Sequence, residues 1–162
     1  MNLDNLKFRT KVIPEDLENI REIIHSTGFF YDFEIDVAIE LAEEYLQYGI
    51  ESEYYFLFAE IDGRTVGYTC FGPIACTKRS FDLYWIAVHN DTRGSGLGKI
   101  LMLETEKIIK DLGGKNIFIE TSSREKYMST QKFYDACGCE LIARIKDFYD
   151  EEDDKLIYKR TV

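Results

Sequence analysis

Residues 82–102 read DLYWIAVHNDTRGSGLGKILM, and the interpretation of the whole chain starts from this stretch. Its first part, Leu83–Val88, is a continuous run of aromatic and branched apolar residues, with the length expected of a strand buried on both faces. A polar break and three closely spaced glycines follow. From Leu97 onward, apolar residues recur at helical spacing. The stretch therefore predicts a strand, a glycine-rich turn and an amphipathic helix.

The turn predicted at residues 93–99 has the properties of an anion-binding site. Glycines let the backbone approach a phosphate closely, the first N–H groups of a helix lack intrahelical acceptors, and the helix dipole is positive at that end. Arg93 and Lys99 add positive charge. These features favour a phosphate site, although a glycine-rich turn between a strand and a helix is also compatible with packing alone.

Three phosphate-binding patterns can be compared with this turn. A Walker A loop requires Gly and then Ser or Thr at two positions where the chain has Arg93 and Ile100. The dinucleotide pattern G-x-G-x-x-G starts at Gly94 but lacks its third glycine, because position 99 is a lysine. The pattern Arg/Gln-x-x-Gly-x-Gly/Ala is matched in full by Arg93, Gly96 and Gly98.

Through this loop the chain resembles the GNAT superfamily of N-acetyltransferases, in which the loop holds the pyrophosphate of acetyl-coenzyme A. The resemblance implies that acetyl-coenzyme A is the co-substrate. It also implies that the backbone N–H of Val88 polarises the thioester carbonyl, and such a donor can stabilise an oxyanion by about 3 kcal/mol. The coenzyme-binding residues implied in this way are Ala87, Val88, Arg93, Gly94, Ser95, Gly96, Leu97, Gly98 and Lys99.

The rest of the chain predicts an α/β protein with a mixed sheet. Its patterns indicate the order β-α-α-β-β-β-α-β-α-β-β, with helices on both sides of the sheet. Asp62-Gly63 between two apolar runs predicts a hairpin, and the last two strands are expected at 141–145 and 155–161 around an acidic turn at 150–154. The GNAT order is the same. We therefore expect the GNAT-like acyl-CoA N-acyltransferase fold, as a single domain over residues 1–162.

Composition and charge narrow the class of protein. A chain of 162 residues that is 45% apolar can bury a proper core. It contains no run of about 18 apolar residues and no basic-then-apolar leader, so we expect neither a membrane span nor a secretory signal, and a cytoplasmic location. The formal charge of −10 argues against binding to nucleic acid.

The charge is also unevenly distributed along the chain. Residues 13–62 contain fourteen acids against Arg21 alone, a balance of −13, whereas residues 63–149 contain thirteen bases and ten acids, a balance of +3. The acidic segment predicts a wall of the acceptor site that favours a cationic amine. The alternative is that these acids only keep the protein in solution.

The cysteines predict neither a disulfide framework nor a metal site. None of them forms a C-x-x-C pair, and the two histidines lie far from them in the sequence. We expect buried or partly buried thiols that form no disulfide at Cys70, Cys76, Cys137 and Cys139, and no metal ion is implied.

A second segment carries the resemblance further. Residues 129–140, STQKFYDACGCE, resemble the GNAT pattern in which a helix carries Phe-Tyr shortly before a glycine. In family members with this pattern the tyrosine is commonly the general acid, which implies that role for Tyr134. A phenol with a pKa of about 10 can protonate a thiolate as it leaves. Without the motif, Tyr134 would be interpreted as a core residue.

Removal of a proton from the amine requires a base, directly or through water. Asp82 matches a strand position where some GNAT enzymes carry a glutamate base, and Glu120, in the next strand, matches the place used by others. The structural alternatives are solvation at a strand edge for Asp82 and pairing with Arg124 or Lys126 for Glu120. The sequence leaves the choice between the two carboxylates open.

The chain departs from the common family pattern in three places. His89-Asn90 replaces x-Pro, Tyr127 stands where an asparagine often contacts pantetheine, and Cys139 replaces an aromatic residue. The function expected is transfer of the acetyl group of acetyl-coenzyme A to a primary amine by direct attack in a ternary complex. The alternative is a catalytically idle sensor or regulatory module that binds acetyl-coenzyme A. The identity of the amine and the existence of a homodimer stay open.

Overall fold

The structure is a computed structural model that describes residues 3–162 and divides the chain into two compact units. Unit one contains the chain up to Gly72 together with Trp85–Thr105, and unit two contains Pro73–Tyr84 and Glu106–Val162. The prediction of a single domain remains a prediction. In chain order the helices and strands are β1 (Leu6–Arg9), α1 (Asp16–Thr27), α2 (Asp32–Tyr48), β2 (Tyr55–Ile61), β3 (Arg64–Pro73), β4 (Ser80–Val88), α3 (Leu97–Asp111), β5 (Asn116–Ser122), α4 (Met128–Ala136), β6 (Glu140–Asp150) and β7 (Asp153–Thr161).

The strands form a mixed sheet, as predicted. Their order is β1-β2-β3-β4-β5-β7-β6. β4 and β5 run parallel, with Ser80–Asp82 in register with Asn116–Phe118, whereas β1 with β2, β2 with β3, β5 with β7 and β6 with β7 are antiparallel. The predicted order of helices and strands is confirmed over the described residues, and so is the mixed α/β fold class.

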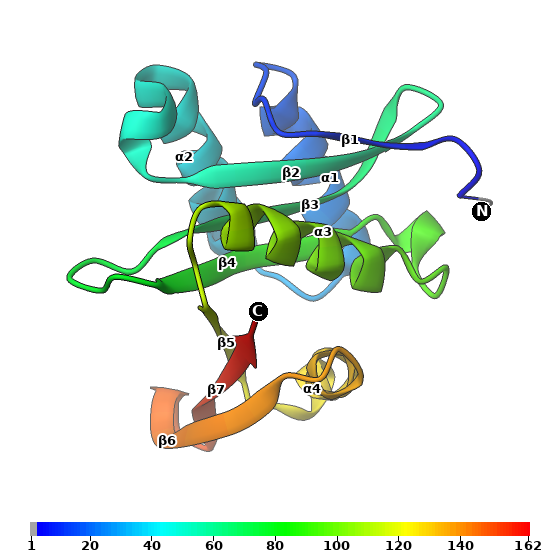
Figure 1. Ribbon diagram of the computed structural model, residues 1–162. Coiled ribbons are helices and arrows are strands. Elements are labelled where there is room, and N and C mark those ends of the chain that lie inside the picture. Colours follow the sequence, from blue (N-terminus) through cyan, green and yellow to red (C-terminus); the bar gives the residue numbers. More distant parts are fainter. Residues whose placement is uncertain (1–2) are drawn as a thin grey trace. The chain divides into compact units, whose positions relative to one another are not determined.

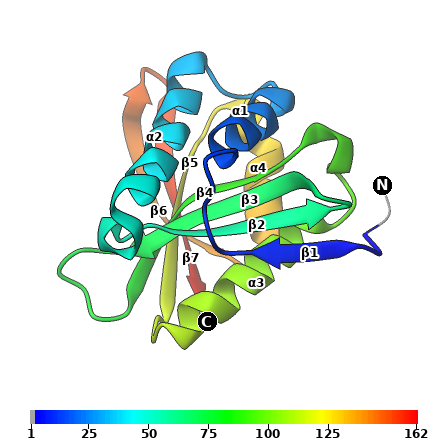
Figure 2. The ribbon, with the colours of Figure 1, turned by 90° about the horizontal axis from the view of Figure 1, so that it is seen from above.

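The core of unit one lies between its strands and the helices α1 and α2. Figure 1 shows both helices behind β2 and β3, and Figure 2 shows β1, β2 and β3 side by side. Each helix presents an apolar stripe at the spacing of a helical face, and alternate residues of the strands meet it. The buried residues of this core include Ile20, Ile23, Ile24, Ile35, Ala38, Ile39, Ala42, Phe56, Phe58, Tyr68 and Cys70.

Tyr68 carries a polar group into this core without a partner. Its side chain is fully buried, it stacks on Phe58 at 6.1 Å between ring centroids, and its hydroxyl has no hydrogen-bond partner among the described residues. Burial raises the pKa of this phenol well above its ordinary value. Burial removes the hydroxyl from water, and no hydrogen bond compensates for the lost hydration. The hydroxyl of Tyr68 therefore lowers the free energy of unfolding.

We therefore expect Tyr68→Phe to stabilise the protein by about 1 kcal/mol, because the substitution removes the unpaired hydroxyl and keeps the ring. The neighbouring Thr69→Val is the matched control with the opposite sign. Thr69 Oγ1 lies 2.8 Å from Thr105 Oγ1 and both side chains are buried, so its loss leaves Thr105 unpaired. Denaturant unfolding of the two variants measures both changes, and a destabilised Tyr68→Phe would show that the hydroxyl has a partner in solution.

Two sequence predictions in this part of the fold are wrong. β4 is not buried on both faces, because Leu83 and Ala87 are buried while Tyr84 is 40% exposed. The thiol of Cys76 is exposed, since it lies in the connection between β3 and β4, whereas Cys70 and Cys139 are buried and Cys137 is partly buried, as expected.

The last hairpin also differs from its prediction. β6 continues to Asp150 instead of ending at Ile145, and its pairing with β7 is irregular between these two residues. Asp147 within this stretch has a left-handed φ of 50°, which breaks the alternation that marks a strand in the sequence. The predicted acidic turn is therefore only Glu151-Glu152, and Asp153 already pairs with Asp150 across the hairpin.

Candidate active site

The predicted anion loop lies in unit one, between the end of β4 and the start of α3. A short 3₁₀ turn, Asn90–Thr92, follows β4, and Arg93 continues in an extended conformation. The backbone then turns through Gly94 and Gly96, whose φ angles are 78° and 87°. Left-handed backbone of this kind suits glycine and is strained for other residues, so the two glycines give the loop its path into the helix.

The first turn of α3 presents backbone donors at this loop. The N–H of Ile100 donates to the carbonyl of Gly96 at 3.2 Å, which is the first hydrogen bond of the helix ladder. The N–H groups of Gly98 and Lys99 precede this ladder and point out of the helix start. Ser95 closes the loop on its other side, because both its N–H and its hydroxyl donate to the carbonyl of Thr92.

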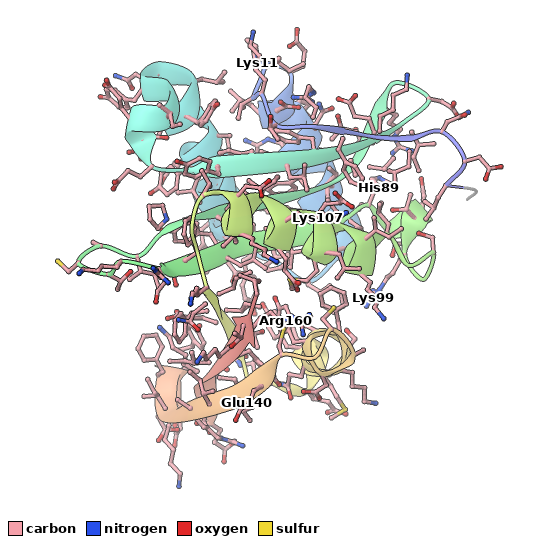
Figure 3. The ribbon with its side chains drawn as sticks, in the orientation of Figure 1. Lys11, His89, Lys99, Lys107, Glu140 and Arg160 are labelled. Atoms are coloured by element: carbon pink, nitrogen blue, oxygen red, sulfur yellow. The ribbon has the colours of Figure 1, made fainter. Side chains whose placement is uncertain are left out.

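Two cations flank these donors. Lys99 is exposed on the first turn of α3 and projects from the end of the helix in Figure 3. The guanidinium of Arg93 lies 4.9 Å from the ring centroid of Phe29, which belongs to the connection between α1 and α2. Positive charge, oriented N–H groups and the positive end of a helix dipole together make a site that can bind a phosphate group.

His89 has a structural role that the sequence did not reveal. It is buried, and its ring Nδ1 accepts a hydrogen bond from the backbone N–H of Asp91 at 3.2 Å. The backbone N–H of His89 donates to the carbonyl of Val66 on β3 at 2.8 Å. Its Nε2 lies 3.0 Å from Nη2 of Arg64. His89 therefore caps the 3₁₀ turn and joins it to β3, immediately before the loop in Figure 3.

At the end of β4, the backbones of β3 and β4 and the first turns of α3 pack closely together. A Cβ atom added at Gly67 of β3 would lie 3.0 Å from Leu101 of α3, 3.1 Å from the carbonyl of Ala87 and 3.2 Å from Val88. Gly67 therefore lets the first turns of α3 and the last residues of β4 pack directly on β3. The sequence-predicted residues Ala87, Val88 and 93–99 are thus brought together in unit one.

Tyr134 lies in unit two, on α4. Its side chain is 5% exposed, and its ring packs against Tyr158 of β7 at 5.4 Å between centroids. Its carbonyl accepts the N–H of Cys139 at 3.0 Å, which closes the helix end. Burial raises the pKa of Tyr134, with smaller contributions from Cys139, Cys137 and Tyr158, so the phenol carries its proton across the whole physiological range.

The two candidate bases lie on adjacent strands of unit two. Asp82 is opposite Phe118 in the β4–β5 register, and Glu120 follows two residues later, on the same face of the sheet. Asp82 is partly buried, and its pKa is raised by burial and by the charge of Glu120, while Lys155 lowers it. The structure therefore brings Asp82 and Glu120 together electrostatically.

The ion pair of Glu120 is not the predicted one. Its Oε2 lies 2.6 Å from Nζ of Lys155 on β7, whereas Arg124 pairs with Asp150 and Asp153. Lys155 is opposite Ser122 in the β5–β7 register, which places it on the same face as Glu120. The sequence offers Arg124 or Lys126 as the ion-pair partner of Glu120. The partner in the structure is instead Lys155, 35 residues further along the chain.

The carboxylates and the phenol lie on opposite faces of the β5–β7 pair. Tyr158, the ring partner of Tyr134, is opposite Ile119, whereas Glu120 is opposite Ile157. Because neighbouring strand residues point to opposite faces, Tyr134 packs on one face while Glu120 lies on the other. Unit two can thus supply a proton acceptor on one side and a proton donor on the other.

Among residues 3–162, no group of three or more His, Cys, Asp or Glu side chains is arranged to hold a metal ion. No helix in this part of the chain combines the length and the apolar character that a bilayer crossing requires.

Comparison with known proteins places this architecture. The sequence model described as the acetyltransferase (GNAT) family matches residues 17–139. A solved structure from Desulfovibrio desulfuricans, assigned to the GNAT family of acetyltransferases, is 42% identical, has a TM-score of 0.94, and the match covers 96% of this chain and 98% of that one. No curated protein matches the chain.

More distant solved structures share the fold. YncA from Salmonella typhimurium with acetyl-CoA is 18% identical, with a TM-score of 0.73 and coverage of 98% and 94% of the two chains. An aminoglycoside 6′-N-acetyltransferase complexed with coenzyme A is 15% identical, with a TM-score of 0.75 and coverage of 96% of each chain.

Proposed function

Because the chain belongs to the GNAT family of acetyltransferases, we propose that it transfers the acetyl group of acetyl-CoA to a primary amine by direct attack. The observation that carries the proposal is the loop at the head of α3, where Arg93, Gly96 and Gly98 meet oriented backbone donors. The solved relatives that hold acetyl-CoA or coenzyme A support the choice of co-substrate. In this proposal the coenzyme binds at Ala87, Val88, Arg93, Gly94, Ser95, Gly96, Leu97, Gly98 and Lys99, and its pyrophosphate lies at the loop 93–99.

The chemistry proposed uses the groups of unit two for proton transfer. A carboxylate, Asp82 or Glu120, takes one proton from the acceptor ammonium, and the neutral amine attacks the thioester carbonyl. The C–N bond forms, the C–S bond breaks, and Tyr134 gives its proton to the departing thiolate. The attacking nitrogen loses its second proton to solvent water, and Tyr134 takes a proton back from solvent. The backbone N–H of Val88 is proposed to stabilise the charge that develops on the carbonyl oxygen.

A thiol-release assay with acetyl-CoA and a panel of primary amines tests the proposal. The panel includes diamines, aminoglycosides, an N-terminal peptide and a lysine peptide, since relatives of this fold include an aminoglycoside acetyltransferase and a ribosomal-protein-S18-alanine acetyltransferase. Release of coenzyme A with formation of an acetylated amine supports the enzyme. Tight binding of acetyl-CoA without turnover on any amine would indicate a sensor or regulatory module instead.

The acceptor proposed is a cationic amine. Residues 13–62 carry the balance of −13, and half of their acids lie exposed on α1 and α2, including Glu18, Glu22, Glu40 and Glu43. A negative surface raises the local concentration of a cation and the rate of its encounter.

The steering predicts a salt effect. At physiological salt the Debye length is about 8 Å, so the second-order rate for the true acceptor should fall several-fold between low salt and about 0.5 M. Coenzyme affinity measured at each salt concentration separates this effect from weaker binding of the co-substrate. A rate that does not depend on salt would contradict the steering and would indicate that these acids only keep the protein in solution.

A further inference from the structure

Lys155 connects the two candidate bases of unit two. Its Nζ lies 2.6 Å from Oε2 of Glu120, and its side chain is only 12% exposed, against 50% for Glu120. A cation so well shielded at this distance neutralises most of the charge of its partner. Glu120 is therefore held as one half of an ion pair with a shielded cation.

Two aromatic rings hold the ammonium of Lys155 in place. Its Nζ lies 3.6 Å from the ring centroid of Phe148 and 5.8 Å from that of Tyr149. The two rings meet edge to face at 5.0 Å, on the irregular part of β6. The face of an aromatic ring is the negative part of its quadrupole and attracts an ammonium group. The two rings therefore keep the ammonium of Lys155 beside Glu120.

Asp82 lies on the same face of the sheet, and no cation among residues 3–162 forms an ion pair of this kind with it. The charged residues that the strand register places on this face of unit two are Glu120 on β5, Asp153, Lys155 and Lys159 on β7, and Glu140 and Asp150 on β6. Of these, Glu120 raises the pKa of Asp82 and Lys155 lowers it, while burial raises it further. Asp82, Glu120 and Lys155 together carry one net negative charge, which leaves room for one more cation.

We propose that Lys155 is a positioning residue that pairs with Glu120 and thereby leaves Asp82 as the carboxylate that takes the proton of the acceptor amine. The inference rests on the proposed acetyltransferase function. Lys155 acts through the two carboxylates and does not itself exchange a proton. It keeps Asp82 ionised at a pH where two unpaired carboxylates on one face would share a proton.

The charge coupling can be measured without an acceptor. The carboxyl ¹³C resonance of Asp82, assigned by its loss in Asp82→Asn, gives the titration midpoint in the full-length protein. Lys155→Met should raise this midpoint by about 0.5–1 pH unit, because a nearby positive charge is removed. Glu120→Gln should lower it by a similar amount, because a negative charge is removed.

Two matched variants complete the measurement. Lys159→Met removes a cation from the same strand and the same face, yet Lys159 does not contribute to the pKa of Asp82, so the midpoint should stay within about 0.2 pH unit. Lys155→Arg keeps the charge and should restore the midpoint to within about 0.2 unit of the native value. Glu120→Gln changes no side-chain volume, so it tests the coupling even if Lys155→Met unfolds.

The pH profile of turnover then tests the assignment of the base. A base works in its ionised form, so turnover rises with pH through the pKa of Asp82, and the acid limb should move up in Lys155→Met and down in Glu120→Gln. Asp82→Asn should lower turnover by roughly 10²-fold or more. Equal midpoints in both charge variants, or a Glu120→Gln enzyme that loses turnover while Asp82→Asn keeps it, would overturn the proposal. If no amine in the panel is acetylated, the proposed function fails by itself, and the carbon titration still decides the coupling.

Discussion

Gly96→Glu should lower the affinity for acetyl-CoA by about 100-fold or more in a protein that still folds. A carboxylate placed about 5 Å from a phosphate charge costs about 3 kcal/mol at an effective dielectric constant of 20. The position is open, since a Cβ atom at Gly96 would meet nothing within 4 Å, so the charge itself is the main change. Titration calorimetry with acetyl-CoA measures the loss.

Two controls separate charge from backbone strain. Gly96→Ala carries the same left-handed φ of 87° without a charge, and we expect less than a tenfold loss of affinity. Gly113→Glu adds the same carboxylate at the other end of α3, where the glycine also has a left-handed φ of 85° and open space, so affinity should stay native. Native affinity in a folded Gly96→Glu protein would remove the loop from the coenzyme site and with it the basis of the proposed function.

Regular patterns made much of the fold predictable. The apolar run Leu83–Val88 marked β4, and Asp62-Gly63 marked the β2–β3 turn. β6 was underestimated because Lys146 and Asp147 interrupt its alternation, and a strand with such an interruption resembles a loop in the sequence. Local periodicity thus identifies strands with one buried face, and it misses a strand that is exposed along nearly all its length.

The candidate site was predictable where it depends on neighbouring residues. The loop at 93–99 is local, because its glycines, cations and helix start are adjacent in the sequence. The partner of Glu120 is not local, because the β5–β7 register selects Lys155, and no pattern near residue 120 indicates it. The same holds for His89, whose capping role depends on the approach of β3 at Val66.

Tyr134→Phe should keep the affinity for acetyl-CoA and lower turnover by roughly 10²–10⁴, the range expected for the loss of a general acid. The ring that packs on Tyr158 is preserved, so stability should change little. The raised pKa of Tyr134 adds a second expectation. Since the phenol stays protonated well above pH 10, ionisation of this group should cause no loss of turnover between about pH 7 and pH 9.

The matched control for this variant is Tyr158→Phe. Tyr158 is also buried and its ring is the contact partner of Tyr134, but no proton transfer is assigned to its hydroxyl. Loss of a buried hydroxyl in general would affect both variants alike, whereas loss of the acid affects only Tyr134→Phe. Steady-state kinetics with the acceptor found in the amine panel, at saturating acetyl-CoA, compares the two. Turnover within about threefold of native in both would assign Tyr134 to the core and leave protonation of the thiolate to water.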